Sequence, residues 1–411
     1  MQGYTMQPEL AYADIEQLAG NAHSALTKSG WPSRKDEAWK FTPLDSYGLD
    51  RLDAANCPEG EAASLKDQTI IFKDGYFQGA GALDSRVSLI HLQRDDKLLV
   101  DWLQLLPKDH HLSYVLLDNV SEAILLEVAA AEHDLAPLNI QFTGQQVSAS
   151  AHPLLLVRLA ENAALTVIEQ HISSNALSAP VLVADLGKSA SLHMAKLQDQ
   201  ASDTSHLGLS VLKLAERAKM NGFTLSKGGK LARMESHVEF MAEYAELVLS
   251  AIYLGASDQH HDITTIVQHE VPNCASNQVI RGVLNEEAHG VFQGKVRVAP
   301  DAQKTDGQQM SRALLLSRDA VADAKPELEI FADDVVCAHG ATVGELDETL
   351  LFYLKSRGIP KAQAQAMLIK AFLGDALEQI EDDDIASFMN QIIDSWAEQN
   401  HDALAMDNSQ G

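Results

Sequence analysis

The N-terminal part of the chain contains two different hydrophobic patterns. In residues 9–28, apolar side chains recur at near-helical spacing and a glycine and a proline follow, which predicts a helix. Segment 31–47 mixes charged residues with aromatic ones, and predicts an irregular strap whose aromatic rings pin it to the core. Beyond the strap, residues 69–72 and 87–92 have the composition of short strands.

A block from about residue 137 to 345 has a third pattern. Short runs rich in Val, Ile, Leu and Thr alternate with polar or glycine-containing turns, without a long helical stripe. Inside the block a phrase recurs, in which an alanine is followed at every second position by an apolar residue or glycine. The phrase occurs at Ala163-Leu165-Val167, Ala190-Leu192-Met194, Ala218-Met220-Gly222 and Ala245-Leu247-Leu249, and returns near Ala288-Gly290-Phe292.

The spacing of this phrase favours one of two all-β architectures. Its first four occurrences are 27, 28 and 27 residues apart. A fixed period with alternation inside each unit is typical of a β-solenoid, in which each rung buries its inner face against its neighbours. Evenly spaced strands of a β-sandwich are the alternative. We therefore predict a mainly β protein with a solenoid core, flanked by helices at both ends.

After Gly344 the pattern becomes helical again. Two apolar stripes, separated by a stop at residues 357–360, predict a helical hairpin over about 345–380, and a further amphipathic stretch follows at 385–396. The predicted domains are an N-terminal helical domain with the strap (1–75), the β-helix core (76–344, with regular rungs from about 137), a C-terminal helical domain (345–400) and a disordered tail (401–411).

Composition narrows the function classes. The 58 acidic and 31 basic side chains give a formal net charge of −27, which repels phosphate backbones and anionic lipid headgroups. We therefore expect neither nucleic-acid nor membrane partners. The three cysteines lie far apart without CxxC spacing, and the first thirty residues lack a secretory pattern, so we expect a cytoplasmic protein. The sequence also lacks the phosphate-loop, HExxH, GxSxG and dinucleotide signatures, which argues against nucleotide hydrolysis by this chain alone.

The most specific candidate site lies in residues 333–342, with the sequence DDVVCAHGAT. If this segment is a strand, Cys337 and His339 project from the same face about 7 Å apart. Thiolate and imidazole suit iron or zinc, and a neighbouring imidazolium would lower the pKa of the thiol. Two ligands do not complete a four-coordinate site, so the others would come from the fold, solvent or a partner chain. A buried cysteine beside a histidine that caps the sheet fits the spacing equally well.

Other histidines give weaker signals. His260, His261 and His269 lie with Asp262 in the run HHDITTIVQH. On a solenoid such residues stack in a ladder more often than they bind metal, and we favour the ladder. The pair at residues 110 and 111 carries still less information.

Several phrases then follow one another in a distinctive order. They are RGVL at 281–284, GVFQGKV at 290–296, AQKTDGQQ at 302–309, LLLS at 314–317, KPELEIFADDVVCAHGATVG at 325–344 and LFYLKSRGI at 351–359. This order closely resembles the SufB/SufD family of iron–sulfur cluster assembly proteins, densely so from about 255 to 375. The strap with Glu37, Trp39 and Thr42 also looks like the family's N-terminal motif. The phrase CAHGATVG resembles SufD members of the family rather than SufB members.

This resemblance implies a right-handed parallel β-helix flanked by helical domains, in a non-catalytic scaffold subunit of the SufBCD complex. Its β-helix would pair with that of SufB, and its C-terminal helices would bind the ATPase SufC. By the same resemblance, Cys337 and His339 match residues at the SufB interface that would hold a transient iron–sulfur cluster or iron, with His339 the stronger candidate. The candidate SufC-binding residues are Leu350, Leu354, Met367 and Phe372.

The resemblance further implies a role in iron acquisition, no catalytic residue, and no tightly bound cofactor in the isolated chain. In isolation, a homodimer is the expected assembly. Two other functions compete with the scaffold. One is a stand-alone sulfur or iron carrier in which Cys337 accepts sulfur. The other is a polysaccharide-acting enzyme, because β-helices also host such chemistry.

Overall fold

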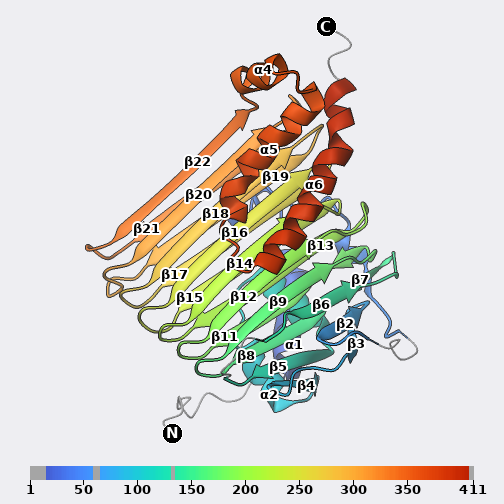
Figure 1. Cartoon of the computed structure of the whole chain (residues 1–411). Coiled ribbons are helices and arrows are strands. Elements are labelled where there is room, and N and C mark those ends of the chain that lie inside the picture. The colour runs from blue at the N-terminus through green and yellow to red at the C-terminus, as the bar shows by residue number, and fades with distance from the viewer. Residues whose placement is uncertain (1–14, 59–64, 131–134, 407–411) are drawn as a thin grey trace.

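The structure is a computed structural model that describes residues 15–58, 65–130 and 135–406. Within these ranges the chain passes back and forth between two facing sheets, and successive turns stack into a solenoid (Figure 1). The strands of successive turns pair in parallel and in continuous register. The prediction of a mainly β fold with a solenoid core and helices at both ends is confirmed.

Alternate strands belong to alternate sheets. Sheet A has the strand order β4 (Val87–Gln93), β5 (Glu122–Val128), β8 (Leu154–Leu159), β11 (Val181–Leu186), β13 (Ser205–Leu214), β15 (Leu231–Phe240), β17 (His260–His269), β19 (His289–Val298) and β21 (Val321–Ile330). The short strands β1 (Asp53–Ala54), β7 (Ala149–Ala151) and β10 (Leu177–Ser178) join its side. Sheet B has the order β3 (Tyr76–Ala80), β2 (Thr69–Lys73), β6 (Leu138–Thr143), β9 (Ala164–His171), β12 (Ser191–Gln198), β14 (Lys219–Ser226), β16 (Glu246–Gly255), β18 (Ala275–Leu284), β20 (Asp306–Leu315) and β22 (Val336–Glu345).

The phrase that recurs in the sequence marks successive rungs of sheet B. The first apolar residues of its four units are direct ladder neighbours, in the order Leu165, Leu192, Met220 and Leu247. Each phrase follows a residue with left-handed backbone, namely Asn162, Ser189, Arg217 and Tyr244. The chain therefore turns in the same way on every rung, which explains the fixed period.

The fifth occurrence of the phrase lies on the other sheet and does not mark the next rung of sheet B. Gly290 and Phe292 lie on β19 in sheet A. The next rung of sheet B instead begins at left-handed Asn273, with buried Cys274 in the place of the alanine. Because one small buried residue can replace another at this corner, the sequence pattern is lost although the structural repeat continues.

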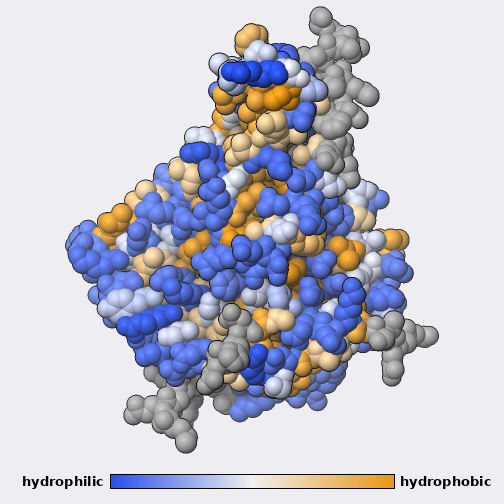
Figure 2. All heavy atoms as spheres, in the orientation of Figure 1, coloured by the Kyte–Doolittle hydropathy of each residue, from blue (hydrophilic) through white to orange (hydrophobic). Residues whose placement is uncertain are grey.

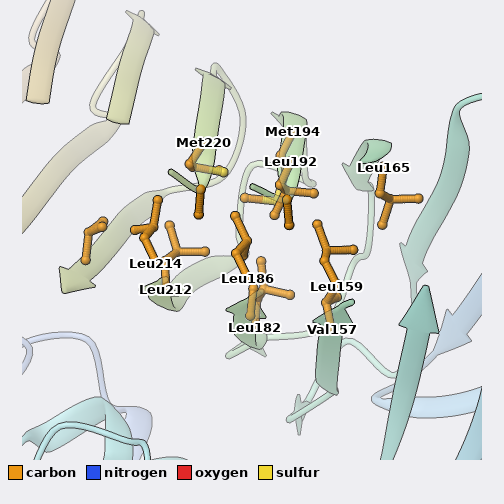
Figure 3. Packing of buried hydrophobic residues seen from close by; sticks show 14 of the residues in the cluster. Val157, Leu159, Leu165, Leu182, Leu186, Leu192, Met194, Leu212, Leu214 and Met220 are labelled. Atoms are coloured by element: carbon orange, nitrogen blue, oxygen red, sulfur yellow. The ribbon is translucent and has the colours of Figure 1, made fainter. Parts of the chain in front are cut away.

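Apolar side chains from both sheets fill the interior of the solenoid. Figure 3 shows Val157, Leu159, Leu182, Leu186, Leu212 and Leu214 of sheet A meeting Leu165, Leu192, Met194 and Met220 of sheet B. Strands of a parallel sheet that is covered on both faces are buried on both sides, which explains their nearly continuous apolar runs.

Histidines extend these ladders, as predicted for the run HHDITTIVQH. His269 stacks on its ladder neighbour Phe240 with ring centroids 4.3 Å apart, and its Nε2 lies 2.9 Å from the hydroxyl of Ser276. His260 packs edge-on against its neighbour His289 at 4.5 Å. These histidines therefore contribute to packing between rungs.

The RGVL phrase has a structural explanation in two contacts. A Cβ atom at Gly282 would lie 2.0 Å from the ring of Tyr253, its buried ladder neighbour on β16. Only glycine fits at that position. The side chain of Arg281 reaches the opposite way, and its Nη2 donates a 2.6 Å hydrogen bond to Oδ2 of Asp375. That ion pair joins the solenoid to a C-terminal helix.

Helices cover the outer faces of both sheets (Figure 1). Sheet A is covered by α1 (Ile15–Ser29), α2 (Lys97–Leu103) and α3 (His111–Asn119), and by a strap with the short 3₁₀ helices η1 (Glu37–Trp39) and η2 (Leu49–Arg51). Sheet B is covered by α5 (Lys361–Leu377) and α6 (Asp383–Met406), which pack on it through a shared apolar cluster. The helix α4 (Glu348–Ser356) projects beyond the last rung.

Several predicted elements agree with these bounds. The N-terminal helix is α1, although residues 9–14 of the predicted span lie outside the described residues. The strands at 69–72 and 87–92 are β2 and β4. The helical hairpin consists of α4 and α5, and Asp347 caps α4 by accepting hydrogen bonds from the N–H groups of Thr349 and Leu350.

Two features differ from the predicted domain plan. The segment 76–344, predicted to be β-helix core, also contains α2 and α3. The helix α6 continues to Met406, so it extends into the predicted tail, whose last residues, 407–411, lie outside the described residues. In the part of the chain that the structure describes, no helix combines the length and the apolar character needed to cross a membrane.

Candidate functional site

The candidate site lies on β22, the last rung of sheet B. This strand pairs with β20 on one side, and no further strand of the described chain pairs with its other side. The turn before it is held by backbone contacts, because Lys304 N–H donates to the carbonyl of Asp334 at 2.6 Å and Val336 N–H donates to that of Thr305 at 2.9 Å. The rung is therefore well anchored on one edge and open on the other.

Cys337 and His339 both lie on this open rung. They are two positions apart on a regular strand and pair with Gly307 and Gln309 of β20. Cys337 packs against the interior cluster, and Gln309 is only 2% exposed. Since side chains alternate along a strand, both residues lie on the face that continues the interior of the solenoid.

The two side chains differ in exposure and in partners. The side chain of His339 is exposed and makes no hydrogen bond or ion pair with any residue that the structure describes. Cys337 is half-buried, and its Sγ would be 3.3 Å from a Cβ atom at position 307, so Gly307 leaves it room. His339 is therefore free to bind a ligand, whereas the thiol is partly enclosed.

The expected activation of the thiol is not observed. Burial raises the pKa of Cys337 above its ordinary value, with a smaller opposing contribution from a hydrogen bond with the backbone of Gly307 and a further increase from Asp306. His339 is not among these causes. The prediction that a neighbouring imidazolium would lower the thiol pKa was therefore wrong, because partial burial dominates at this position.

Cys337 and His339 do not complete a metal site by themselves. Among the described residues, the group of three or more metal-binding side chains whose ligand atoms converge is His110, Glu235 and His237, which lies elsewhere on the solenoid. A cluster or iron bound by Cys337 and His339 would therefore need ligands from outside this part of the chain.

The predicted SufC-binding residues are only partly exposed. Leu350 and Met367 are exposed, whereas Leu354 and Phe372 are half-buried, and Phe372 packs against the chain's own apolar cluster under α5 and α6. The sequence pattern missed Phe352, which is 72% exposed, and Tyr353, which is 54% exposed. Figure 2 shows hydrophobic atoms gathered at the top of the molecule, where α4 lies. In the sequence, Phe352 and Tyr353 could have been found as large apolar residues that lie outside the apolar stripe of this helix.

Large apolar side chains are also exposed around the last rungs. They are Val321, Ile330, Phe331, Val336 and Val343. All lie on β21, on β22 or in the turn between these strands. The open end therefore combines two unpaired strand edges with apolar side chains.

Comparison with known proteins agrees with this architecture. A family model for the SUF system of FeS cluster assembly, the SufBD core domain, matches residues 142–372, which is more than half of the chain. This chain belongs to the SufBD family.

Individual SufBD-family proteins match over most of the chain. The iron–sulfur cluster assembly protein SufD of Escherichia coli (strain K12) is 30% identical over 375 residues, which cover 87% of each protein. An iron–sulfur cluster assembly SufBD family protein of Synechocystis sp. is 28% identical over 381 residues, covering 85% of this chain and 84% of the relative. SufD of Bacillus subtilis (strain 168) is 35% identical over a shorter stretch of 129 residues. The SufBD-family chain described here is thus SufD-like and belongs to iron–sulfur cluster assembly.

Proposed function

We propose that this SufD-like chain is a non-catalytic scaffold subunit of a cytoplasmic SufBCD complex. In this proposal its open rung pairs with SufB, Cys337 and His339 contribute to a site for a transient iron–sulfur cluster or iron at that interface, and α4 with α5 binds the ATPase SufC. The observation that carries the proposal is the location of both candidate ligands on a rung whose outer edge is unpaired.

The strand edges support pairing with another β-helix. β21 and β22 are each ten residues long, and each pairs with a strand on one side only. Long exposed edges with apolar side chains invite a further strand, and soluble proteins usually protect them. A partner that adds a strand would satisfy the free N–H and C=O groups of the edge. In the absence of SufB, a second copy of this chain is the expected partner for the same edge.

The ligand shortage supports a shared site. His339 offers an unengaged imidazole, and Cys337 offers a sulfur at the mouth of the interior. Iron and iron–sulfur clusters favour thiolate and imidazole ligands, and a four-coordinate metal needs more than two. SufB would supply the remaining ligands, and the cluster or iron would be cargo that leaves the complex, consistent with a role in iron acquisition.

The C-terminal helices support binding of a second protein. Four large apolar or aromatic side chains are exposed on α4 and α5, namely Leu350, Phe352, Tyr353 and Met367. A cleft of about 640 Å³ lies between these helices and the turns after β18 and β20, and is lined by Arg318, Glu345 and Lys355 among others. An apolar helix surface beside a polar cleft suits a helix-in-groove contact.

The carrier alternative is less well supported. A stand-alone sulfur carrier would need Cys337 to attack a sulfur donor, and the thiolate is the reactive form. Burial raises the pKa of this thiol and so lowers the thiolate fraction near neutral pH. Persulfide formation on the isolated protein would favour the carrier.

The first test concerns the candidate ligands. Wild type, His339→Ala and Cys337→Ala are each co-expressed with SufB and SufC, and complex formation and anaerobic iron–sulfur absorbance are measured. We expect all three complexes to form and cluster content to collapse for His339→Ala, because that exposed imidazole makes no hydrogen bond or ion pair with the described residues. His91→Ala is the matched control, since His91 is another partly exposed histidine. Undiminished cluster content in both site variants would refute the assignment while leaving the scaffold role intact.

The second test concerns the SufC surface. Phe352→Asp and Met367→Asp each place a charge on an exposed apolar position, and we expect both to abolish co-purification of SufC, because a desolvated charge opposes docking. Val147→Asp serves as the control, because Val147 is 70% exposed and lies near the opposite end of the solenoid. Retention of SufC by both variants would show that it binds elsewhere.

A further inference from the structure

Three metal-binding side chains converge on the outer face of sheet A. The ligand atoms of His110, Glu235 and His237 all lie within 4.8 Å of one another. Glu235 and His237 are two positions apart on β15 and therefore share a face of the strand. His110 comes from the turn between α2 and α3 and directly precedes α3. Packing of the helices on the sheet thus assembles the group from segments 125 residues apart.

Both imidazoles point at one carboxylate oxygen. Nε2 of His110 and Nε2 of His237 each lie 2.7 Å from Oε1 of Glu235. In zinc sites the metal–nitrogen and metal–oxygen distances of 2.0 to 2.2 Å place neighbouring donors of a tetrahedral ion about 3.3 Å apart. A displacement of each ring by roughly half an ångström would create that spacing. The two histidine side chains are 17% and 12% exposed, so each ring keeps one side open to solvent.

The other carboxylate oxygen is already fixed. Arg233 donates to Oε2 of Glu235 from Nε at 3.0 Å and from Nη2 at 2.7 Å, and both side chains are 1% exposed. Arg233 also donates from Nη1 to Asp262 at 2.7 Å, and its guanidinium lies 3.9 Å from the ring centroid of Trp39 in the strap. These contacts orient Glu235 so that Oε1 faces the histidines. Such outer contacts are what hold metal-binding carboxylates in place.

The local charge favours a cation. With neutral imidazoles, the single guanidinium of Arg233 opposes two carboxylates, those of Glu235 and Asp262, which leaves one net negative charge in a buried setting. Two imidazole nitrogens and one carboxylate oxygen suit divalent first-row transition ions, whereas magnesium and calcium prefer oxygen ligands alone.

The group is also accessible. A cleft of about 260 Å³ adjoins the ring of His237 and is lined by Pro107 and Lys108 of the turn that carries His110. Of the three ligands, His237 lines this cleft. A site with three protein ligands and an adjoining cleft leaves a fourth position for water or an exchangeable group, which distinguishes it from a closed structural site.

We infer that His110, Glu235 and His237 form a binding site for a divalent first-row transition metal ion of the Zn²⁺ or Fe²⁺ class, with water as the fourth ligand. The site is separate from Cys337 and His339 and does not depend on the proposed scaffold function. The alternative is a purely hydrogen-bonded cluster, in which each imidazole donates its Nε2–H to Glu235. Bound metal would tie the turn before α3 to β15, so it should also stabilise the fold.

The test uses the full chain with Cys57→Ser, Cys337→Ser and His339→Ala, which removes competing exposed ligands. This protein is titrated with Co²⁺ under anaerobic conditions while its visible absorption is recorded, and with Zn²⁺ in competition against a chelating dye. We expect one Co²⁺ per chain with the visible spectrum of a tetrahedral nitrogen and oxygen site, displaced by Zn²⁺, together with a higher melting temperature.

Four site variants and one control separate the two explanations. His110→Ala and His237→Ala remove a ligand, and we expect each to weaken binding by more than the about 10- to 100-fold that outer-shell changes cause. His110→Gln and His237→Gln retain an N–H donor for Glu235, so they should keep the metal-free melting temperature and still lose the metal. His91→Ala, which disrupts a histidine–carboxylate pair elsewhere, should bind normally. Absence of stoichiometric binding, or equal binding by the parent and all four site variants, would show a hydrogen-bonded cluster only.

Discussion

The two ends of the solenoid are built differently. At the N-terminal end, β3 pairs antiparallel with β2 and β4 pairs antiparallel with β5, and the helices α1 to α3 with the strap lie over sheet A. The interior there is closed, with Ile70, Phe72 and Leu126 almost fully buried. At the other end β21 and β22 stop the two sheets without a cap, and Val336 is 66% exposed.

The two ends therefore have different roles: the capped end stabilises the fold, and the open end is available for binding. Solenoids need a cap at each end to remain soluble, because an uncapped rung exposes both its backbone edge and its apolar face. The N-terminal end carries its cap within the chain. The C-terminal end lacks one in the described residues and also holds both candidate ligands. The proposed pairing with SufB would supply this cap.

The largest expected effect comes from blocking the open edge. Val336 N–H points toward β20 and donates to the carbonyl of Thr305, the residue before that strand. By alternation the N–H of Val343, seven residues later, points to the open side of β22. Val343→Pro removes only that outward donor, and proline is tolerated on strand edges. We expect complete loss of SufB co-purification with little change in the unfolding midpoint of the isolated chain.

The control for this variant is Val343→Ala, which shortens the same side chain but keeps the N–H group. It should retain most SufB binding if the backbone edge carries the contact. Equal binding by the proline and alanine variants would mean that the edge of β22 is not the interface, and would remove the main argument from the contrast between the two ends.

The next effect compares the same kind of truncation at both ends. Leu126→Ala at the capped end should cost about 2 to 5 kcal/mol of unfolding free energy, because it leaves a cavity in a closed interior. Val336→Ala at the open end should change the unfolding free energy by no more than about 0.5 kcal/mol, as is usual for exposed positions. Urea unfolding followed by circular dichroism measures both. A large cost at Val336 would show that the open end already contributes to the stability of the isolated chain.

The smallest expected effect is the titration of the thiol at the open end. Because burial raises the pKa of Cys337, its alkylation by iodoacetamide should reach half its maximal rate above pH 9.0. Folding then favours the thiol form, and this contribution to stability is lost as the pH rises through the raised pKa. A Cys57→Ser background leaves Cys337 as the accessible cysteine, since Cys274 is buried. A midpoint at or below pH 9.0 would indicate an exposed thiol.

Strand alternation was sufficient to place Cys337 and His339 together, because two residues separated by one position share a face on any strand. Helical periodicity placed α4 and α5 correctly, but it selected Phe372, which packs inward, and missed Phe352. A stripe of apolar residues identifies the buried face of a helix, and a partner surface lies on another face.

What the sequence determined by itself was the local repeat: a turn with one left-handed residue, a small buried residue and an alternating strand, which together specify a rung. Only the tertiary structure decided which features lie on the open end and which lie under the helices. The convergence of His110 with Glu235 and His237 shows the reason, since it depends on how α3 packs against sheet A. Periodicity along a chain reports which face of an element is buried, and carries no information about which distant segment covers it.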